Sequence, residues 1–326
     1  MSACKRILIF GATGLIGRHI VRQILTRKGD FEHIAIFTSP DTVESKREEI
    51  RQLEAEGIEI LVGSLMNEAD VRKAYEEVDT VVSAVGRNMI QHQIELIRLA
   101  DETPNIRRFF PSEYGTDIEH NPESPGEKPH QNKIKVRSFI RSCKNLDYTF
   151  LVTGPYADGD PGLYLSSNHG ATHTGSFDVR TKTAVLLGSG DLSIAFTTMA
   201  DVGKLLLAAL LHPESSRNKA LKVKSFTTTD GRILEEFEKQ TGGEKWQVSY
   251  ASLDELKRLE KEAWTTGDHL ATLITLRRIW ATGGTLYEEW DNKLIGEPAV
   301  QSVAEAVATA IDVQLYGEQE MKRKLV

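Results

Sequence analysis

Short apolar runs alternate along the first half of the chain with longer segments in which apolar residues recur every three or four positions. The first run, residues 5–10, leads directly into glycine and is too uniformly apolar for a half-exposed strand, which is typical of a buried strand in a parallel sheet. The same pattern predicts further strands at 33–38, 58–62, 80–85, 106–110 and 148–152.

Helical spacing fills the intervals between these runs. Ile16, Ile20 and Ile24 recur on one face after the first strand, and amphipathic segments follow at 67–77 and 90–102. This alternation predicts an α/β fold of the Rossmann type, with a doubly wound parallel sheet. Ligands of such a sheet bind beyond the carboxyl ends of its strands.

The pattern changes after residue 155. Residues 156–178 are rich in Gly, Asp, Ser and His, as in a long loop that covers a site or is disordered. Residues 183–197 predict a strand pair around Gly188-Ser189-Gly190, and the acid-rich stretch 116–127 predicts an exposed loop. Helices are predicted at 199–212, 230–240, 252–264, 268–281 and 299–312. We therefore expect an NAD(P)-binding domain over 1–155 and a smaller C-terminal α/β substrate-binding lobe over 156–326, with some later strands returning to the main sheet.

Three glycines, in GATGLIG, separate the first strand from the first helix. Gly11 would permit a tight turn, Gly14 the close approach of a pyrophosphate, and Gly17 the packing of helix on strand. The free N–H groups and positive dipole at the helix start would bind the phosphates. The first gap is one residue longer than in the usual motif, and glycines also mark ordinary turns. The strand before and the helix after nevertheless favour dinucleotide binding.

Residues after the second predicted strand bear on the choice between NAD and NADP. An NAD site places an acidic residue there, on the ribose 2′-hydroxyl. Here the strand ends in Thr38 and Ser39, and Lys46 and Arg47 follow. Hydroxyls and cations favour the 2′-phosphate of NADP(H), although Lys46 and Arg47 would also suit a solvated helix.

Small and polar residues follow the other predicted strands as well. Because the carboxyl ends of parallel strands meet at one edge of a sheet, these residues should line a single crevice with the glycine loop. They are Gly63, Ser64 and Leu65; Ala84, Val85 and Gly86; Pro111, Ser112 and Glu113; and Gly154, Pro155 and Tyr156.

Composition narrows the classes of function. The 326 residues include 40 Lys and Arg against 47 Asp and Glu, a net charge of −7 that argues against nucleic-acid binding. No apolar run is long enough to span a membrane and a strand begins at once, so we expect neither a membrane segment nor a signal peptide. Cys4 and Cys143 lack metal or redox spacing, and His169 and His173 alone do not make a metal site. We expect a cytoplasmic, metal-free monomer or homodimer.

The proton-transfer residue must differ from that of ordinary short-chain dehydrogenases, which place a Tyr four residues before a Lys. None of the eight tyrosines has a Lys at that spacing. Lys133 is the alternative candidate, because Ile134 and Arg137 continue at helical spacing and place it in the first turn of a helix. The helix dipole and an oxidised nicotinamide would both favour its neutral form, which suits a general acid or base. A solvated helix lysine is the other interpretation.

GATGLIG, FFPSEYG and the K-x-x-x-R of Lys133 and Arg137 together resemble the isoflavone reductase-like family. This family lies in the NmrA-like branch of atypical short-chain dehydrogenases and includes phenylcoumaran benzylic ether, pinoresinol–lariciresinol and isoflavone reductases. Its members have a glycine motif, then PSEFG after the fifth strand, then a Lys about twenty residues further on. TGPY, the segment 225–229 and LRRIW resemble fungal-type members.

This resemblance implies a Rossmann fold, NADP(H) and a reductase of secondary metabolism. It implies that Lys133 transfers the proton and that Ala84, Val85 and Gly86 lie against adenosine and phosphate. The implied pyrophosphate residues are Gly11, Thr13, Gly14, Leu15, Ile16 and Gly17. Those implied near the nicotinamide are Gln93, Pro111, Ser112, Glu113, Pro155 and Tyr156.

Several positions leave more than one interpretation. Plant members place Arg near Thr38, on the 2′-phosphate, whereas this chain does not. Tyr114 replaces the Phe of PSEFG, either as a buried partner or as a second proton donor. Glu113 has three interpretations: a catalytic carboxylate, a residue that stabilises Lys133, or a helix cap. His130, one turn before Lys133, relays protons or is a capping or surface residue.

We therefore predict an NADPH-dependent oxidoreductase that reduces a small aromatic or alkaloid-like electrophile: an enone, quinone methide, benzylic ether or imine. Lys133 would be its general acid or base. A redox-neutral cyclisation in the same pocket is one alternative, and an NAD(P)-redox-sensing regulator without turnover is another. Lys133 and PSEYG favour an enzyme, because the resemblance implies that such regulators lack both.

Overall fold

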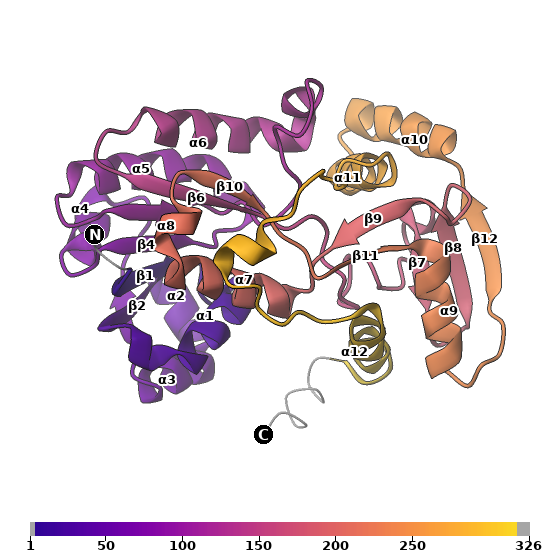
Figure 1. Ribbon diagram of the computed structural model, residues 1–326, viewed down its shortest axis with the longest axis horizontal. Helices are drawn as coiled ribbons and strands as arrows, with labels where there is room; N and C mark the ends of the chain where they lie inside the picture. The colour runs from indigo at the N-terminus through magenta and orange to yellow at the C-terminus, as the bar shows by residue number, and fades with distance from the viewer. Residues whose placement is uncertain (1–3, 318–326) are drawn as a thin grey trace.

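The computed structural model describes residues 4–317, so residues 1–3 and the end of the predicted C-terminal lobe, residues 318–326, lie outside the described part. Two lobes lie side by side along the long axis of the molecule (Figure 1). The first half of the chain builds the larger lobe, and most of the second half builds the smaller one.

A seven-stranded sheet forms the centre of the larger lobe, in the order β10-β6-β5-β4-β1-β2-β3. All neighbouring strands are parallel. The strands are β1 (Arg6–Phe10), β2 (His33–Thr38), β3 (Glu59–Val62), β4 (Thr80–Ser83), β5 (Arg108–Phe110), β6 (Asp147–Val152) and β10 (Lys219–Lys222). The predicted doubly wound parallel sheet is confirmed, although β4 and β5 are shorter than their apolar runs.

Helices cover both faces of this sheet because its central strands are apolar on both sides. Ile7 and Ile9 of β1 pack in the same cluster as residues of α1, α3 and α7, whereas Leu8 and Phe10 pack with residues of α4, α5 and α6. The helices of this lobe are α1 (Gly17–Thr26), α2 (Pro40–Ser45), α3 (Arg47–Ala55), α4 (Glu68–Tyr75), α5 (Gln93–Glu102), α6 (Gln131–Ser142), α7 (Met199–Leu211) and α8 (Pro213–Ser216). Short 3-10 turns are η1 (Lys28–Asp30), η2 (Arg87–His92), η3 (Ser124–Gly126) and η4 (Lys128–His130).

The smaller lobe contains two small sheets. One has the order β12-β8-β7, and the other pairs β11 with β9. Their strands are β7 (Ser176–Asp178), β8 (Thr183–Leu187), β9 (Ser193–Phe196), β11 (Phe226–Thr229) and β12 (Gln247–Ala251). The helices are α9 (Asp230–Gln240), α10 (Leu253–Thr266), α11 (Ala271–Ala281) and α12 (Val303–Tyr316), with turns η5 (Thr172–Thr174) and η6 (Asp291–Ile295).

The predicted strand pair around Gly188-Ser189-Gly190 is wrong. Both strands exist, as β8 and β9, but β8 pairs with β7 and β12 while β9 pairs with β11. The carbonyl oxygen of Gly190 accepts a hydrogen bond from the N–H of Gly231 at 2.7 Å, so the turn is fastened to the start of α9 instead of closing a hairpin. The loop expected over 156–178 includes β7 at its end.

The expectation that 116–127 is an exposed loop is wrong for its first residues. Thr116, Asp117 and Ile118 are at most 6% exposed. The Asp117 carboxylate pairs with Arg137 of α6 at 2.9 Å, and its backbone N–H donates to the Tyr287 hydroxyl at 2.9 Å. The acidic residue is therefore held inside by a buried cation.

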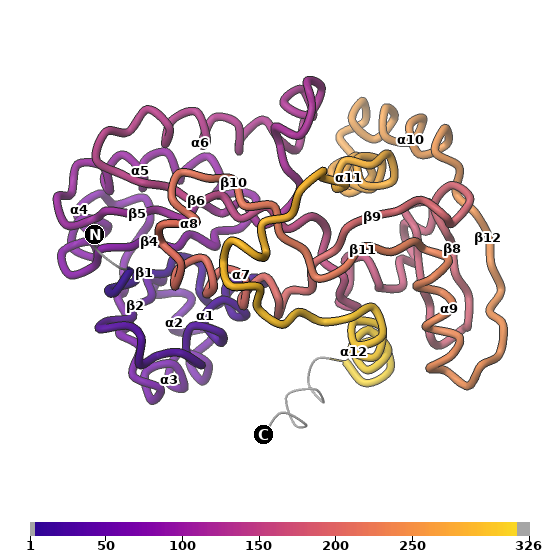
Figure 2. Tube along the Cα trace, in the orientation of Figure 1, coloured from indigo at the N-terminus to yellow at the C-terminus, as the bar shows by residue number. Residues whose placement is uncertain are grey.

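Later segments return to the larger lobe. β10 extends the main sheet beside β6, and α7 packs on α1. The chain after α11 runs back along α7 and β10 through η6 before it enters α12 (Figure 2).

Candidate active site

The glycine loop lies where the strand order of the main sheet reverses, between β1 and β4. Gly11 has a φ of +73°, and a Cβ there would collide with the carbonyl oxygen of Ala84. A Cβ on Gly17 would collide with the carbonyl oxygen of Gly11. A Cβ on Gly14 would lie 3.1 Å from that same oxygen. The loop therefore holds strand, turn and helix in close contact, which requires glycine at Gly11 and Gly17.

The start of α1 fits a phosphate group. No side-chain hydrogen bond caps this helix and no acidic residue lies in its first turn, so its positive end has no acidic or capping side chain of its own. Thr13 and Ile16 are buried beside it, while Leu15 is 45% exposed.

The residues predicted for a 2′-phosphate do not all have free polar groups. Thr38 ends β2 and is 9% exposed. The Ser39 hydroxyl caps α2, accepting from the N–H of Thr42 at 3.2 Å. Lys46 reaches back to the glycine loop, where its ammonium donates to the carbonyl oxygen of Thr13, whereas Arg47 stays exposed. Of these cations, Lys46 is the one placed beside the glycine loop.

A buried hydrogen-bond network ties the ends of β4 and β5 together. The Ser112 hydroxyl donates to the carbonyl oxygen of Val85 at 2.9 Å. Gln93, 1% exposed, accepts from the N–H of Ser112 at 2.8 Å and donates to the carbonyl oxygen of Ile90 at 3.2 Å. The polar groups of Gln93 are thus used to fix the turns that carry Ala84, Val85, Gly86 and Pro111.

The polar groups of Ser64 are engaged in a local turn. Ser64 follows β3, the outermost strand on its side of the sheet. Its N–H donates to the Asp70 carboxylate at 2.9 Å, and its hydroxyl accepts from the N–H of Met66 at 3.2 Å. These bonds form the turn before α4.

Lys133 lies in the first turn of α6, in agreement with its predicted helical position. Its ammonium donates to the main-chain carbonyl oxygen of Glu113. Burial lowers the pKa of Lys133 to about 8; the Glu113 carboxylate opposes this shift, and the cations Arg87 and Arg137 add to it. The amine is therefore poised to exchange a proton near neutral pH.

The Glu113 carboxylate is bound by Arg137, not by Lys133. The guanidinium Nε and Nη2 donate to Oε1 and Oε2, each at 3.1 Å, and both side chains are at most 2% exposed. Arg137 also pairs with Asp117 at 2.9 Å and Glu119 at 2.8 Å. Glu113 therefore contacts Lys133 through its main-chain carbonyl oxygen, while its carboxylate belongs to the ion-pair network around Arg137.

Two other candidates are buried. Tyr114 is 6% exposed with a φ of +25°, its hydroxyl has no hydrogen-bond partner within the described residues, and burial raises its pKa. His130 is 3% exposed, so the surface interpretation is wrong, and its side chain does not cap α6. Its Nδ1 bonds to the carbonyl oxygen of Ser124 at 2.7 Å, and burial lowers its pKa.

The segment after β6 completes this edge of the sheet. Gly154 has a φ of +66°, and a Cβ there would lie 2.8 Å from the carbonyl oxygen of Ala195. The Pro155 carbonyl accepts from the N–H of Thr197 at 3.1 Å. The Tyr156 hydroxyl donates to the main-chain carbonyl oxygen of Tyr114 at 2.7 Å. The PSEYG turn therefore receives Lys133 on one carbonyl and Tyr156 on the next.

Sequence reasoning assigned no role to three charged residues near this site, although Arg137 was part of the K-x-x-x-R motif. Arg137 is the centre of the ion-pair network, and Arg87 acts electrostatically on both Lys133 and Tyr156. Asp158 is 8% exposed and accepts from the N–H of Met199 at the start of α7 at 2.9 Å; burial raises its pKa to about 7. The only sequence signal for Arg87 is its place directly after the strand-end Gly86.

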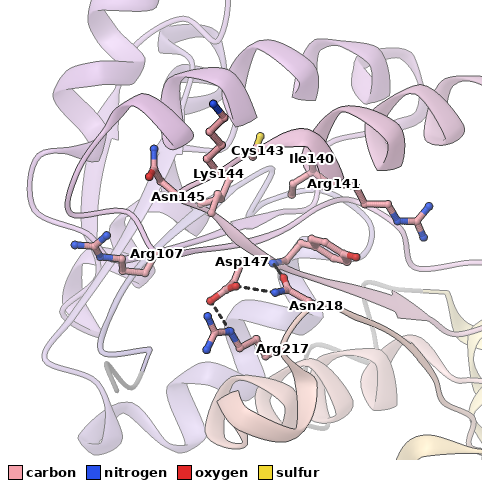
Figure 3. Close-up of a pocket in the computed structure, with 11 residues that line it drawn as sticks. Arg107, Ile140, Arg141, Cys143, Lys144, Asn145, Asp147, Arg217 and Asn218 are labelled. Atoms are coloured by element: carbon pink, nitrogen blue, oxygen red, sulfur yellow. Dashed lines mark hydrogen bonds and ion pairs between the residues drawn. The ribbon is translucent and has the colours of Figure 1, made fainter.

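A cavity of about 570 Å³ lies elsewhere, at the amino ends of β5, β6 and β10 (Figure 3). Asp147 and Arg217 on its wall form an ion pair at 2.8 Å, and no predicted site residue lines it.

Among residues 4–317, no three His, Cys, Asp or Glu side chains are grouped as metal ligands. No helix in that range has the length and apolar character needed to cross a bilayer.

Comparisons with known proteins support the resemblance seen in the sequence. The NmrA-like family profile matches residues 3–272. An isoflavone reductase from Pisum sativum is 28% identical over 302 residues, covering 88% of this chain and 91% of its own length. The oxidoreductase aprR of Aspergillus flavus is 28% identical over 314 residues, covering 94% and 98%. A leucoanthocyanidin reductase from Vitis vinifera, solved in a binary complex with NADPH, has a TM-score of 0.79 at 21% identity and covers 94% of this chain and 99% of its own.

Proposed function

The chain belongs to the NmrA-like family, and from that premise we propose that it is an NADPH-dependent reductase of a small aromatic or alkaloid-like electrophile. The observation that carries the proposal is Lys133, a half-buried amine with a pKa near 8 bonded to the turn that follows β5. This turn lies on the same edge of the sheet as the glycine loop.

We assign residues of the chain to the pyrophosphate and the 2′-phosphate of the cofactor. The glycine loop and the uncapped start of α1 would hold the pyrophosphate. Lys46, bonded to Thr13 of that loop, would bind the 2′-phosphate with Thr38. NADPH, when bound, supplies a hydride to an electrophilic carbon of the substrate.

Lys133 would supply the matching proton. Its Nζ, charged for the most part below pH 8, donates a proton to the substrate atom that gains electron density. Arg137 acts through Glu113, because their ion pair fixes the turn whose carbonyl oxygen orients Nζ. Tyr114 keeps its proton because its pKa is raised, and its buried hydroxyl remains a donor without a partner among the described residues.

NADPH consumption against enones, benzylic ethers, quinone methides and imines tests this proposal, with Lys133→Met compared to wild type. Lys135→Met is the matched control, since Lys135 is an exposed lysine of the same helix. We expect Lys133→Met to lower kcat by about 10²-fold or more with NADPH affinity retained. Full turnover in that variant would refute the role of Lys133. Tight NADPH binding with no consumption on any compound would favour the redox-sensing regulator, and product formation without consumption would favour the cyclisation.

We further propose a cytoplasmic protein that acts as a monomer or homodimer. Both cysteines, Cys4 and Cys143, are free thiols, as in a reducing compartment. Cell fractionation and sedimentation would establish location and assembly.

A further inference from the structure

Arg87 is an unpaired cation at the proposed active site. It opens η2 directly after Gly86, at the carboxyl end of β4. Its side chain is exposed, and within residues 4–317 it has no ion pair or hydrogen bond. Some surface arginines, Arg98 and Arg258 among them, pair with acidic neighbours on their own helices.

Arg87 lies close enough to polar groups of two other elements to act on their charge. η2 packs against α6, which carries Lys133. The Arg87 charge acts on the Lys133 ammonium and on the hydroxyl of Tyr156, which follows β6. Surrounding protein lowers the pKa of Arg87 by desolvation although the side chain still meets solvent.

The two carboxylates that act on Lys133 and Tyr156, the same groups as Arg87, are already engaged. Glu113 is bound by Arg137 at 3.1 Å, and Asp158 accepts from the start of α7 at 2.9 Å. Within the described part of the chain, no carboxylate pairs with Arg87 or Lys133. A protein with a net charge of −7 therefore keeps Arg87 without a carboxylate partner, beside a lysine whose opposing carboxylate, Glu113, is held by Arg137. Such an arrangement is unfavourable without a ligand and favours an anion.

We propose that Arg87 binds an anionic oxygen group of the substrate, a carboxylate or a phenolate, while Lys133 handles the proton. The planar guanidinium suits such a group because it donates two parallel hydrogen bonds. This inference rests on the proposed function and narrows the substrate class to acidic aromatic compounds. The cofactor diphosphate carries the same oxygen chemistry, and the experiment separates the two sources.

The experiment measures binding of trans-cinnamate and its uncharged methyl ester to the full chain saturated with NADP⁺. The two probes share one carbon skeleton, so their difference reports recognition of the charge. We expect wild type to bind cinnamate about ten-fold or more tightly than the ester, because hydrogen bonds to charged groups contribute that much. Arg87→Gln should remove the difference, and Arg87→Lys should restore part of it.

Arg51→Gln is the charge-matched control, since Arg51 is exposed on α3. It should bind both probes as wild type does. Equal binding of the two probes by wild type, or no binding of cinnamate, would overturn the proposal. A weaker NADPH affinity in Arg87→Gln with the cinnamate preference intact would assign Arg87 to the cofactor diphosphate instead. Failure of wild type to bind NADPH at all would be a separate result, against the proposed function itself.

Discussion

Replacing Arg137 by Met tests whether the buried ion-pair network holds the catalytic turn. The Arg137 side chain is 1% exposed and donates to Glu113, Asp117 and Glu119. Met keeps much of the volume and removes the charge. Glu113, at 3% exposure, would then be buried without an ion-pair partner, whereas Asp117, at 4%, would keep Lys222 at 3.7 Å.

Removing one partner of a buried ion pair lowers the free energy of unfolding by about 3–5 kcal/mol, because the remaining charge stays desolvated. Glu113 loses its ion-pair partner and Asp117 loses the nearer of two, so we expect a loss within that range. The effect has a pH dependence whose sign follows from burial. An unpaired buried carboxyl has a higher pKa in the folded than in the unfolded state, so the folded variant binds more protons. The deficit of the variant should therefore be larger near about pH 8 than near about pH 5.5.

Urea unfolding followed by tryptophan fluorescence measures this deficit. Arg141→Met is the control, because Arg141 is 41% exposed and pairs with Glu119 at the surface. It should lose less than about 1 kcal/mol. Adding Glu113→Gln to Arg137→Met should recover part of the lost stability, since it removes the buried carboxylate charge that Arg137 paired with. A loss below about 1 kcal/mol in Arg137→Met, or a deficit that grows as pH falls, would refute the reasoning.

Three further predictions concern the proton donor and the cofactor site. Reduction should slow as pH rises through about 8, where Lys133 loses its proton, and this limb should move to higher pH in Lys133→Arg; a pH–rate profile flat through that region would contradict the assignment. Gly17→Ala should lower the free energy of unfolding in urea by roughly 2 kcal/mol or more and weaken NADPH binding, because the new Cβ would collide with a backbone carbonyl. Gly29→Ala, which has open space around the new Cβ, should change that free energy by no more than roughly 0.5 kcal/mol. Lys46→Ala should reduce the preference for NADPH over NADH by about ten-fold with NADH affinity unchanged. Arg47→Ala, at an exposed position, should leave that preference unchanged. Equal effects of the two variants on nucleotide affinity, measured by titration, would contradict the assignment of Lys46 to the 2′-phosphate.

Local pattern predicted the larger lobe because its signals are local. The apolar runs, the glycine loop and the helical position of Lys133 each depend on residues adjacent in sequence. The errors lie where distant residues decide. Strands β8 and β9 are adjacent in sequence, which predicts that they pair with each other. In the structure the turn between them is hydrogen-bonded to Gly231, and the two strands belong to separate sheets.

The candidate site divides in the same way. Charge and composition made 116–127 look solvated, but Asp117 is buried because Arg137, on a helix later in the chain, neutralises it. Likewise, no spacing rule connects Arg87, Lys133 and Tyr156. Arg87 acts electrostatically on the other two only because the fold brings η2, α6 and the end of β6 together. Partners supplied by the tertiary fold leave no pattern in a single sequence.

Fluorescence titration of the wild-type protein with NADPH and NADH tests the central claim most directly. We predict saturable binding of NADPH, weaker binding of NADH, and unchanged NADPH binding in Lys133→Met. Absence of binding for both nucleotides would contradict the account, because the glycine loop, Lys46 and Lys133 would then have no cofactor to serve.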